Sequence, residues 1–144
     1  MDAALGIVII GLSLLCWGGQ SFSWVRPSTA VRLGLTEDED DVEPVYWADS
    51  RGEALWDTLV LWTMVVAGVL LVLDRPSWAY FGLVGGGMYL YFAGRGILTR
   101  VAIARRGFRV GDPKGVRIAF IFLAVWGVLA LVTIVAAIAE LESW

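Results

Sequence analysis

The sequence predicts an all-α integral membrane protein that crosses the bilayer four times. Hydrophobic residues make up 58% of the 144 positions and charged residues only 17%, which is more apolar surface than a soluble domain of this length can bury. Four stretches are long and apolar enough to cross about 30 Å of hydrocarbon, which takes about 20 helical residues. Because no repeat of 20–50 residues is visible, we expect residues 1–144 to form one four-helix domain in a lipid bilayer.

The four predicted spans cover residues 3–24, 55–73, 78–98 and 116–139. Their charged side chains, Asp57, Arg95 and Arg117, lie near span ends, from which long side chains can reach the membrane interface. Aromatic residues typical of an interfacial belt also fall near the predicted ends: Trp24, Trp56, Trp78, Tyr80 and Trp144.

The first span could instead be a cleaved signal peptide. A signal peptide needs a basic start and a small-residue cleavage site. No Lys or Arg precedes Arg26, and the residues next to Cys16 are bulky. An uncleaved helix is therefore favoured.

The distribution of Lys and Arg predicts the orientation of the bundle. The loop 25–53 holds three of these cations and the loop 99–115 holds five, whereas the loop 74–77 holds Arg75 alone. Cytoplasmic loops are enriched in Lys and Arg. We therefore expect both long loops in the cytoplasm and both the N and C termini outside.

The connection 74–77 is too short to let the second and third spans separate. Pro76 cannot continue a helix and disfavours the helical conformation at Arg75. The two spans should therefore be antiparallel neighbours joined in a tight hairpin.

Counting outward from this hairpin predicts two ion pairs. Asp57 lies 17 residues before Asp74, and Arg95 lies 18 residues after Ser77, so at about 1.5 Å per residue both are roughly 26 Å from the turn. Unpaired charges in hydrocarbon are costly, so Asp57 is expected to pair with Arg95, and Glu53 to approach Arg100. A structural clamp is the favoured interpretation, and a polar substrate site is the alternative.

Acidic residues mark the start of the second span. Ser50 followed by Glu53 fits a capping box, which predicts a helix starting at Ser50. Asp49, Glu53 and Asp57 could together bind a divalent cation through oxygen ligands. Helix capping explains the same residues without a metal and is favoured.

Two charged loop segments share the predicted cytoplasmic side. The acidic run 36–43 lacks the pattern of a calcium loop and is expected to be solvated, to pair with the basic loop 99–115, or to face a basic partner. The basic loop could attract anionic lipid headgroups through Arg105, Arg106, Arg109 and Lys114. The third helix could continue to Arg106 before Gly107 ends it.

The third span contains closely spaced glycines at Gly82, Gly85, Gly86 and Gly87. Small residues let membrane helices approach closely. Because three consecutive glycines cover most sides of one turn, we expect more than one neighbouring helix to pack there.

The composition narrows the function classes. The chain has no histidine and one cysteine, Cys16, which removes the usual haem, zinc and iron–sulfur ligands, so no cofactor is expected. The net charge of −3 suggests no nucleic-acid partner. The favoured function is a structural or accessory subunit, homo-oligomeric or part of a membrane complex.

Two other functions stay open at this point. One is an oligomeric channel or transporter, and the other is a metal-dependent enzyme acting on a lipid phosphate at the cytoplasmic face. Cation usage of ten arginines and one lysine indicates a prokaryote with GC-rich DNA, so the expected location is the plasma membrane.

Overall fold

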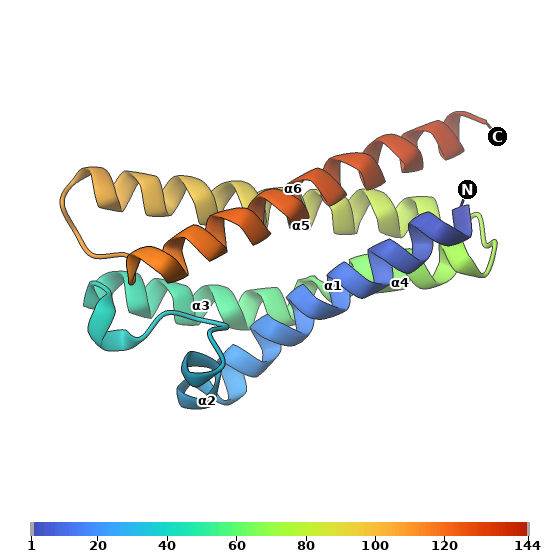
Figure 1. Cartoon of the computed structure of the whole chain (residues 1–144). Helices are drawn as coiled ribbons and strands as arrows, with labels where there is room; N and C mark the ends of the chain where they lie inside the picture. Colours follow the sequence, from blue (N-terminus) through green and yellow to red (C-terminus); the bar gives the residue numbers. More distant parts are fainter. Residues whose placement is uncertain (1, 144) are drawn as a thin grey trace.

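The computed structural model describes residues 2–143, and every regular element in that range is helical (Figure 1). Trp144, expected at the interface, lies outside the described residues. The elements are α1 (Asp2–Val25), α2 (Pro27–Arg32), the 3-10 turn η1 (Glu39–Asp41), α3 (Pro44–Val60), α4 (Trp62–Val72), α5 (Trp78–Arg105) and α6 (Pro113–Glu142).

Three helical stretches within residues 2–143 are long and apolar enough to cross a membrane. They are Ala3–Val25, Pro44–Val72 and Pro113–Glu142. The 28-residue helix α5 is long enough but less apolar, because it contains six glycines and three arginines. The all-helical, membrane-compatible fold is thus confirmed, whereas a fourth span along α5 stays a prediction.

The long helices alternate in direction along the chain, so the connections between them lie at the two ends of the bundle. Figure 1 shows both termini and the α4–α5 turn at one end, called here the turn end. The α1–α3 connection and the α5–α6 connection lie at the other, called here the loop end. Helix α5 packs between α4 and α6, and α1 packs against α3 and α4. Helices α1 and α6 touch little, as do α3 and α5, so the two halves of the bundle are poorly joined at the loop end.

Glycines set the closest helix contacts. A Cβ atom on Gly85 would lie 2.8 Å from the Met64 backbone on α4, and one on Gly86 would lie 3.3 Å from the Ala130 carbonyl oxygen on α6. Gly82 also faces α6, with 3.3 Å to the Ala137 Cβ. Neighbouring glycines of α5 therefore contact two different helices, as expected from their spacing.

Two further features of the glycine pattern differ from the sequence analysis. A Cβ on Gly87 would have no atom within 4 Å, so this glycine lies outside the contact. A close contact between α1 and α4 was also not predicted. Gly6 on α1 and Gly68 on α4 face each other, and a Cβ atom on either glycine would lie 3.0 Å from the carbonyl oxygen of the other.

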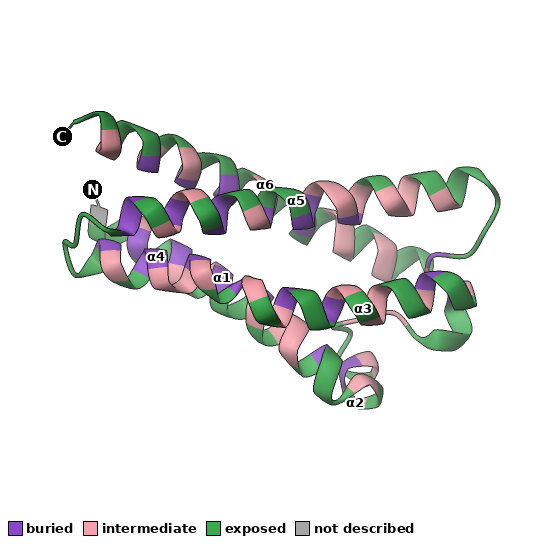
Figure 2. Ribbon diagram, turned by 180° about the vertical axis from the view of Figure 1, so that it is seen from behind, coloured by how far each residue is buried: buried purple, intermediate pink, exposed green. Residues whose placement is uncertain are grey.

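The core lies between the helices in the turn half of the bundle. Ile9, Met64, Ala79 and Tyr89 are fully buried there. The Tyr89 hydroxyl donates a 3.0 Å hydrogen bond to the Ser13 carbonyl oxygen and so joins α5 to α1. Large apolar side chains are exposed along the outer faces of all the long helices (Figure 2), where lipid would cover them.

The helix that was expected to start at Ser50 starts six residues earlier. Helix α3 begins at Pro44, which follows the extended residue Glu43. Proline suits a first helical turn because its ring fixes φ and its missing N–H needs no partner. Ser50 and Glu53 therefore lie inside the helix, and the capping-box prediction was wrong.

A side chain from α1 marks the boundary between α3 and α4. The Trp17 indole Nε1 donates a 2.9 Å hydrogen bond to the Thr58 carbonyl oxygen, which in a regular helix would accept from the amide of Trp62. A side chain that takes up a carbonyl oxygen of the backbone hydrogen-bond ladder interrupts the helix at that point. The interruption falls at Leu61. Helix α5 ends at Arg105 and Gly107 adopts φ +82°, so the predicted stop is confirmed.

Candidate functional site

The loop end of the bundle contains a cavity of about 550 Å³. It is lined by α1, α3, α5, α6 and the residues that follow α2. The cavity forms because two pairs of helices make few contacts: α1 with α6, and α3 with α5. We call it the loop-end cavity. Its lining toward the middle of the bundle, called here the floor, is mainly apolar and aromatic, and its lining at the loop end, called here the mouth, contains the charged residues.

Aromatic side chains form the floor of the loop-end cavity. Trp126 on α6 donates a 3.0 Å hydrogen bond from Nε1 to the Leu12 carbonyl oxygen on α1, which joins the two helices below the cavity. The Phe92 ring meets Trp126 edge-on at 5.9 Å, and Phe122 lies 5.5 Å from it between ring centroids. Cys16 completes the floor and is buried.

An ion pair crosses the wall of the cavity. Arg100 on α5 contacts Glu37 at 2.6 Å between Nη2 and Oε1, and its Nη1 donates a 3.0 Å hydrogen bond to the Gly96 carbonyl oxygen. The guanidinium also lies over the Tyr46 ring, 5.8 Å from its centroid. Burial lowers the pKa of Arg100, but the attraction and hydrogen bond of Glu37, together with smaller contributions from Tyr46 and Glu53, raise the pKa above its ordinary value. Arg100 therefore stays charged.

Arg95 bridges α5 to α3 with two carboxylates. Its Nη2 atom lies 2.7 Å from Asp49 Oδ2, and its Nη1 atom lies 2.7 Å from Glu53 Oε1. Asp49 and Glu53 are four residues apart and so share one helix face. These are the main links between two helices that otherwise touch little, so Arg95 joins α3 to α5 beside the cavity, whose lining contains Glu53 but not Arg95.

Neither of the two expected ion pairs forms a salt bridge within residues 2–143. Arg95 contacts Asp49 and Glu53 instead of Asp57, and Arg100 contacts Glu37 instead of Glu53. The expectation assumed that residues at equal distances from the α4–α5 turn would pair, but long arginine side chains extend toward the solvent-exposed end of a helix. Each arginine therefore finds its partner closer to the loop end.

Asp57 is buried on α3, with an exposed fraction of 4%. Its Oδ2 atom has no hydrogen-bond partner among the described residues. The proposed metal ligands Asp49, Glu53 and Asp57 do not form a metal site, and residues 2–143 contain no group of three or more acidic or cysteine side chains placed to hold one. Asp49 and Glu53, two of the three ligands of the less favoured metal alternative, turn to Arg95 instead.

The acidic and basic loops contact each other at the loop end. Arg109 donates from Nη1 to the Asp40 carbonyl oxygen at 2.6 Å, and its backbone carbonyl accepts from the Glu43 amide at 3.0 Å. Val42 and Val110 pair in an isolated antiparallel bridge. The four predicted lipid contacts, Arg105, Arg106, Arg109 and Lys114, are all exposed, and of these Arg109 also contacts the acidic loop.

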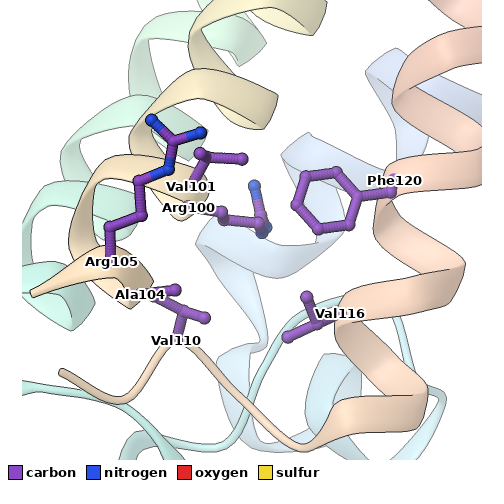
Figure 3. A pocket seen from close by; sticks show the side chains of 7 residues that line it. All are labelled: Arg100, Val101, Ala104, Arg105, Val110, Val116 and Phe120. Atoms are coloured by element: carbon purple, nitrogen blue, oxygen red, sulfur yellow. The ribbon is translucent and has the colours of Figure 1, made fainter. Parts of the chain in front are cut away.

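A second, smaller cavity of about 350 Å³ lies between the loop-end parts of α5 and α6 (Figure 3). Its lining is apolar apart from Arg100 and Arg105. In Figure 3 the Arg100 side chain extends toward Phe120, whereas the Arg105 side chain turns away along α5. This cavity offers fewer polar groups than the loop-end cavity, which is therefore the stronger candidate site.

Comparison of the chain with protein-family models, curated proteins and solved structures found no match. Sequence analysis did not single out Glu37 or Trp126, which hold the wall and the floor. The acidic run contained Glu37, but nothing in its spacing distinguished this residue from its neighbours.

Proposed function

We propose that this chain is a four-span structural subunit of a prokaryotic plasma membrane that assembles with further copies of itself through α5. In this proposal α5 is the fourth span, the loop end faces the cytoplasm and both termini lie outside. The excess of Lys and Arg in the two long loops supports this orientation. A different partner subunit is the alternative occupant of the same helix face.

The uncovered face of α5 is the observation that carries the proposal. Its residues alternate in steps of four and three, so they form one continuous stripe along the helix. This α5 stripe consists of Tyr80, Val84, Gly87, Tyr91, Gly94 and Leu98. Four of these side chains are more than half exposed, with Tyr91 at 64% and Leu98 at 67%. Exposed positions recur along α5 in Figure 2.

The two glycines of the stripe are open at the surface. A Cβ atom at Gly87 or at Gly94 would have no atom within 4 Å. Gly82, Gly85 and Gly86 on the other faces already contact α4 and α6. Small residues at helix interfaces let backbones approach in membranes, where association depends on packing. An open glycine stripe on the third face is therefore suited to receive one more helix.

The composition of α5 gives independent support. It is the long helix that falls short of the apolarity of a lipid-facing span, although it lies between α4 and α6 in the bundle. A helix of this kind is better surrounded by protein than by lipid, because lipid offers no partner to polar groups. Assembly through the α5 stripe would surround it on all sides.

The oligomeric mass of the purified protein tests the proposal. In nanodiscs or mild detergent, the wild-type chain is expected to be a dimer or larger, and the variant Gly87→Leu/Gly94→Leu a monomer. The matched control is Gly11→Leu/Gly18→Leu on α1, where two glycines with the same spacing are also open. The control should keep the wild-type mass. A monomeric wild type without a co-purifying partner, or dissociation by the control alone, would contradict the proposal.

A transporter is the second candidate, and the loop-end cavity is the observation that favours it. The cavity extends from the charged mouth to Trp126, about the depth at which an alternating-access site would lie. Solute flux into liposomes tests this candidate. Flux that is lost in Trp126→Ala would support it, and the absence of flux for every class of solute tried would leave the structural subunit as the function.

A further inference from the structure

We propose that the loop-end cavity binds a small organic cation, an amine or other onium group carried on an apolar or aromatic body. This inference is independent of the assembly through α5. It rests on the size of the cavity, on the separation of its apolar floor from its charged mouth, and on the sign of the charges that remain unpaired.

The size of the cavity suits a small organic molecule. About 550 Å³ lies within the range of about 300–1,000 Å³ that is typical of ligand pockets. The floor offers an apolar body the rings of Phe92, Phe122 and Trp126. Aromatic faces also attract cations, so the floor favours a positive over a negative head group.

The charged residues at the mouth also favour a ligand with a positive head group. Eight ionisable side chains line the cavity: Glu37, Asp38, Asp41, Glu53, Asp112, Arg51, Arg100 and Lys114. Glu37 is paired with Arg100, and Glu53 with Arg95 outside the lining. Arg51 donates to the carbonyl oxygens of Ser23 and Trp24 and lies over the Trp24 ring.

Three carboxylates and two cations, one of them Arg51, then remain without an oppositely charged partner. Asp38, Asp41 and Asp112 form no salt bridge within residues 2–143, and neither do Arg51 and Lys114, so the carboxylates exceed the cations by one. The unpaired charge at the mouth is therefore negative. A cation entering from the loop end would be attracted, and an anion of the same shape would be repelled.

One polar group of the cavity lining, at the level of Arg51, lacks a partner among the described residues. Ser23 lines the cavity with an exposed fraction of 4%, and its Oγ atom has no hydrogen-bond partner among the described residues. Buried hydroxyls are normally hydrogen-bonded. A protonated amine that reaches this level could donate to Ser23 Oγ, which places the head group above the aromatic floor.

Binding of two ions of one shape and opposite charge tests the proposal. The probes are tetraphenylphosphonium and tetraphenylborate, measured by equilibrium dialysis against the full chain in nanodiscs after subtraction of empty nanodiscs. Saturable binding of the phosphonium, at least tenfold tighter than that of the borate and weakened by salt, is expected. Equal binding of the two ions would overturn the choice of a cation.

Substitutions at two adjacent glycines test whether the phosphonium binds in the cavity. Gly19 lines the cavity and Gly18 does not, although neither would have an atom within 4 Å of a Cβ. Gly19→Trp should fill the space and weaken phosphonium binding at least tenfold, whereas Gly18→Trp should leave it unchanged. Equal affinities of the two variants would overturn the site. The oligomeric mass of Gly19→Trp should stay at the wild-type value, which separates this test from that of the α5 stripe.

Discussion

Arg95 on α5 contacts Glu53 on α3 through a 2.7 Å ion pair between Nη1 and Oε1, one helical turn nearer the loop end than the buried Asp57. The same guanidinium holds Asp49. These contacts join two helices that otherwise diverge around the loop-end cavity. The clamp expected from the sequence therefore has an arginine at its centre, but different carboxylates.

Glu53→Gln should lower the stability of the fold, whereas Asp57→Asn should not. Glu53→Gln removes one of the two carboxylates that hold Arg95 and is expected to lower the free energy of unfolding by about 1 kcal/mol, since the pair is partly exposed. Asp57→Asn removes a buried carboxylate whose Oδ2 has no partner and should leave stability unchanged or raise it. Thermal unfolding in one detergent compares them. A larger loss for Asp57→Asn would mean that Asp57 carries the clamp.

The Arg100–Glu37 pair should be more sensitive than the Arg95 clamp. Both side chains are at most 14% exposed, and removing one partner of such a pair leaves the other charge unpaired and largely buried. Glu37→Gln is expected to cost about 2–3 kcal/mol, and the double variant Glu37→Gln/Arg100→Met should recover part of it. A double-mutant cycle on thermal unfolding measures the coupling. Additive losses would show that the two residues do not interact.

Gly85 and Gly87 of α5 should differ sharply in their tolerance of alanine. Gly85→Ala would place a Cβ 2.8 Å from the Met64 backbone on α4 and is expected to lower stability by about 1–3 kcal/mol. Gly87→Ala meets nothing in the monomer and should raise monomer stability by about 0.5–1 kcal/mol through helix propensity. Equal effects of the two substitutions would contradict the packing described for α5.

Lipid binding should depend on Arg105 and Arg106 but not on Arg109. The first two are exposed, so Arg105→Gln/Arg106→Gln is expected to weaken association with anionic lipid by about 1 kcal/mol per charge. Arg109 donates to the Asp40 and Val42 carbonyl oxygens, so Arg109→Gln should lower stability instead. Native mass spectrometry with phosphatidylglycerol separates the two effects. Retention of lipid by the double variant would exclude these arginines as headgroup contacts.

Hydropathy and turn chemistry predicted where the long helices lie, but not the start of α3 or the interruption at Leu61. The first predicted span, 3–24, became Asp2–Val25, and Pro76 with its neighbours gave the short α4–α5 turn. The start of α3 was missed because Ser50 and Glu53 also fit a capping box, whereas Pro44 decides the actual start. Both Pro44 and the Ser50–Glu53 pair are signals for the start of a helix, and α3 begins at the earlier of the two.

The cavity and the ion-pair partners could not be predicted in the same way. Depth along a helix follows from residue counting, but partner choice also depends on helix rotation and on how far an arginine extends. The hydrogen bond from Trp126 to Leu12 joins residues 114 positions apart, and no local pattern indicates it. The divergence of α3 from α5 is likewise a property of the whole bundle.

Cross-linking through the α5 stripe tests the central claim most directly. In a Cys16→Ser background, Tyr91→Cys places one cysteine on the stripe, and Val128→Cys places one on the exposed face of α6, at 64% and 61% exposure of the native side chains. After mild oxidation in intact membranes, the Tyr91→Cys chain is expected to migrate as a covalent dimer and the Val128→Cys chain as a monomer. A Tyr91→Cys chain that stays monomeric, or dimers that form equally at both positions, would contradict assembly through α5.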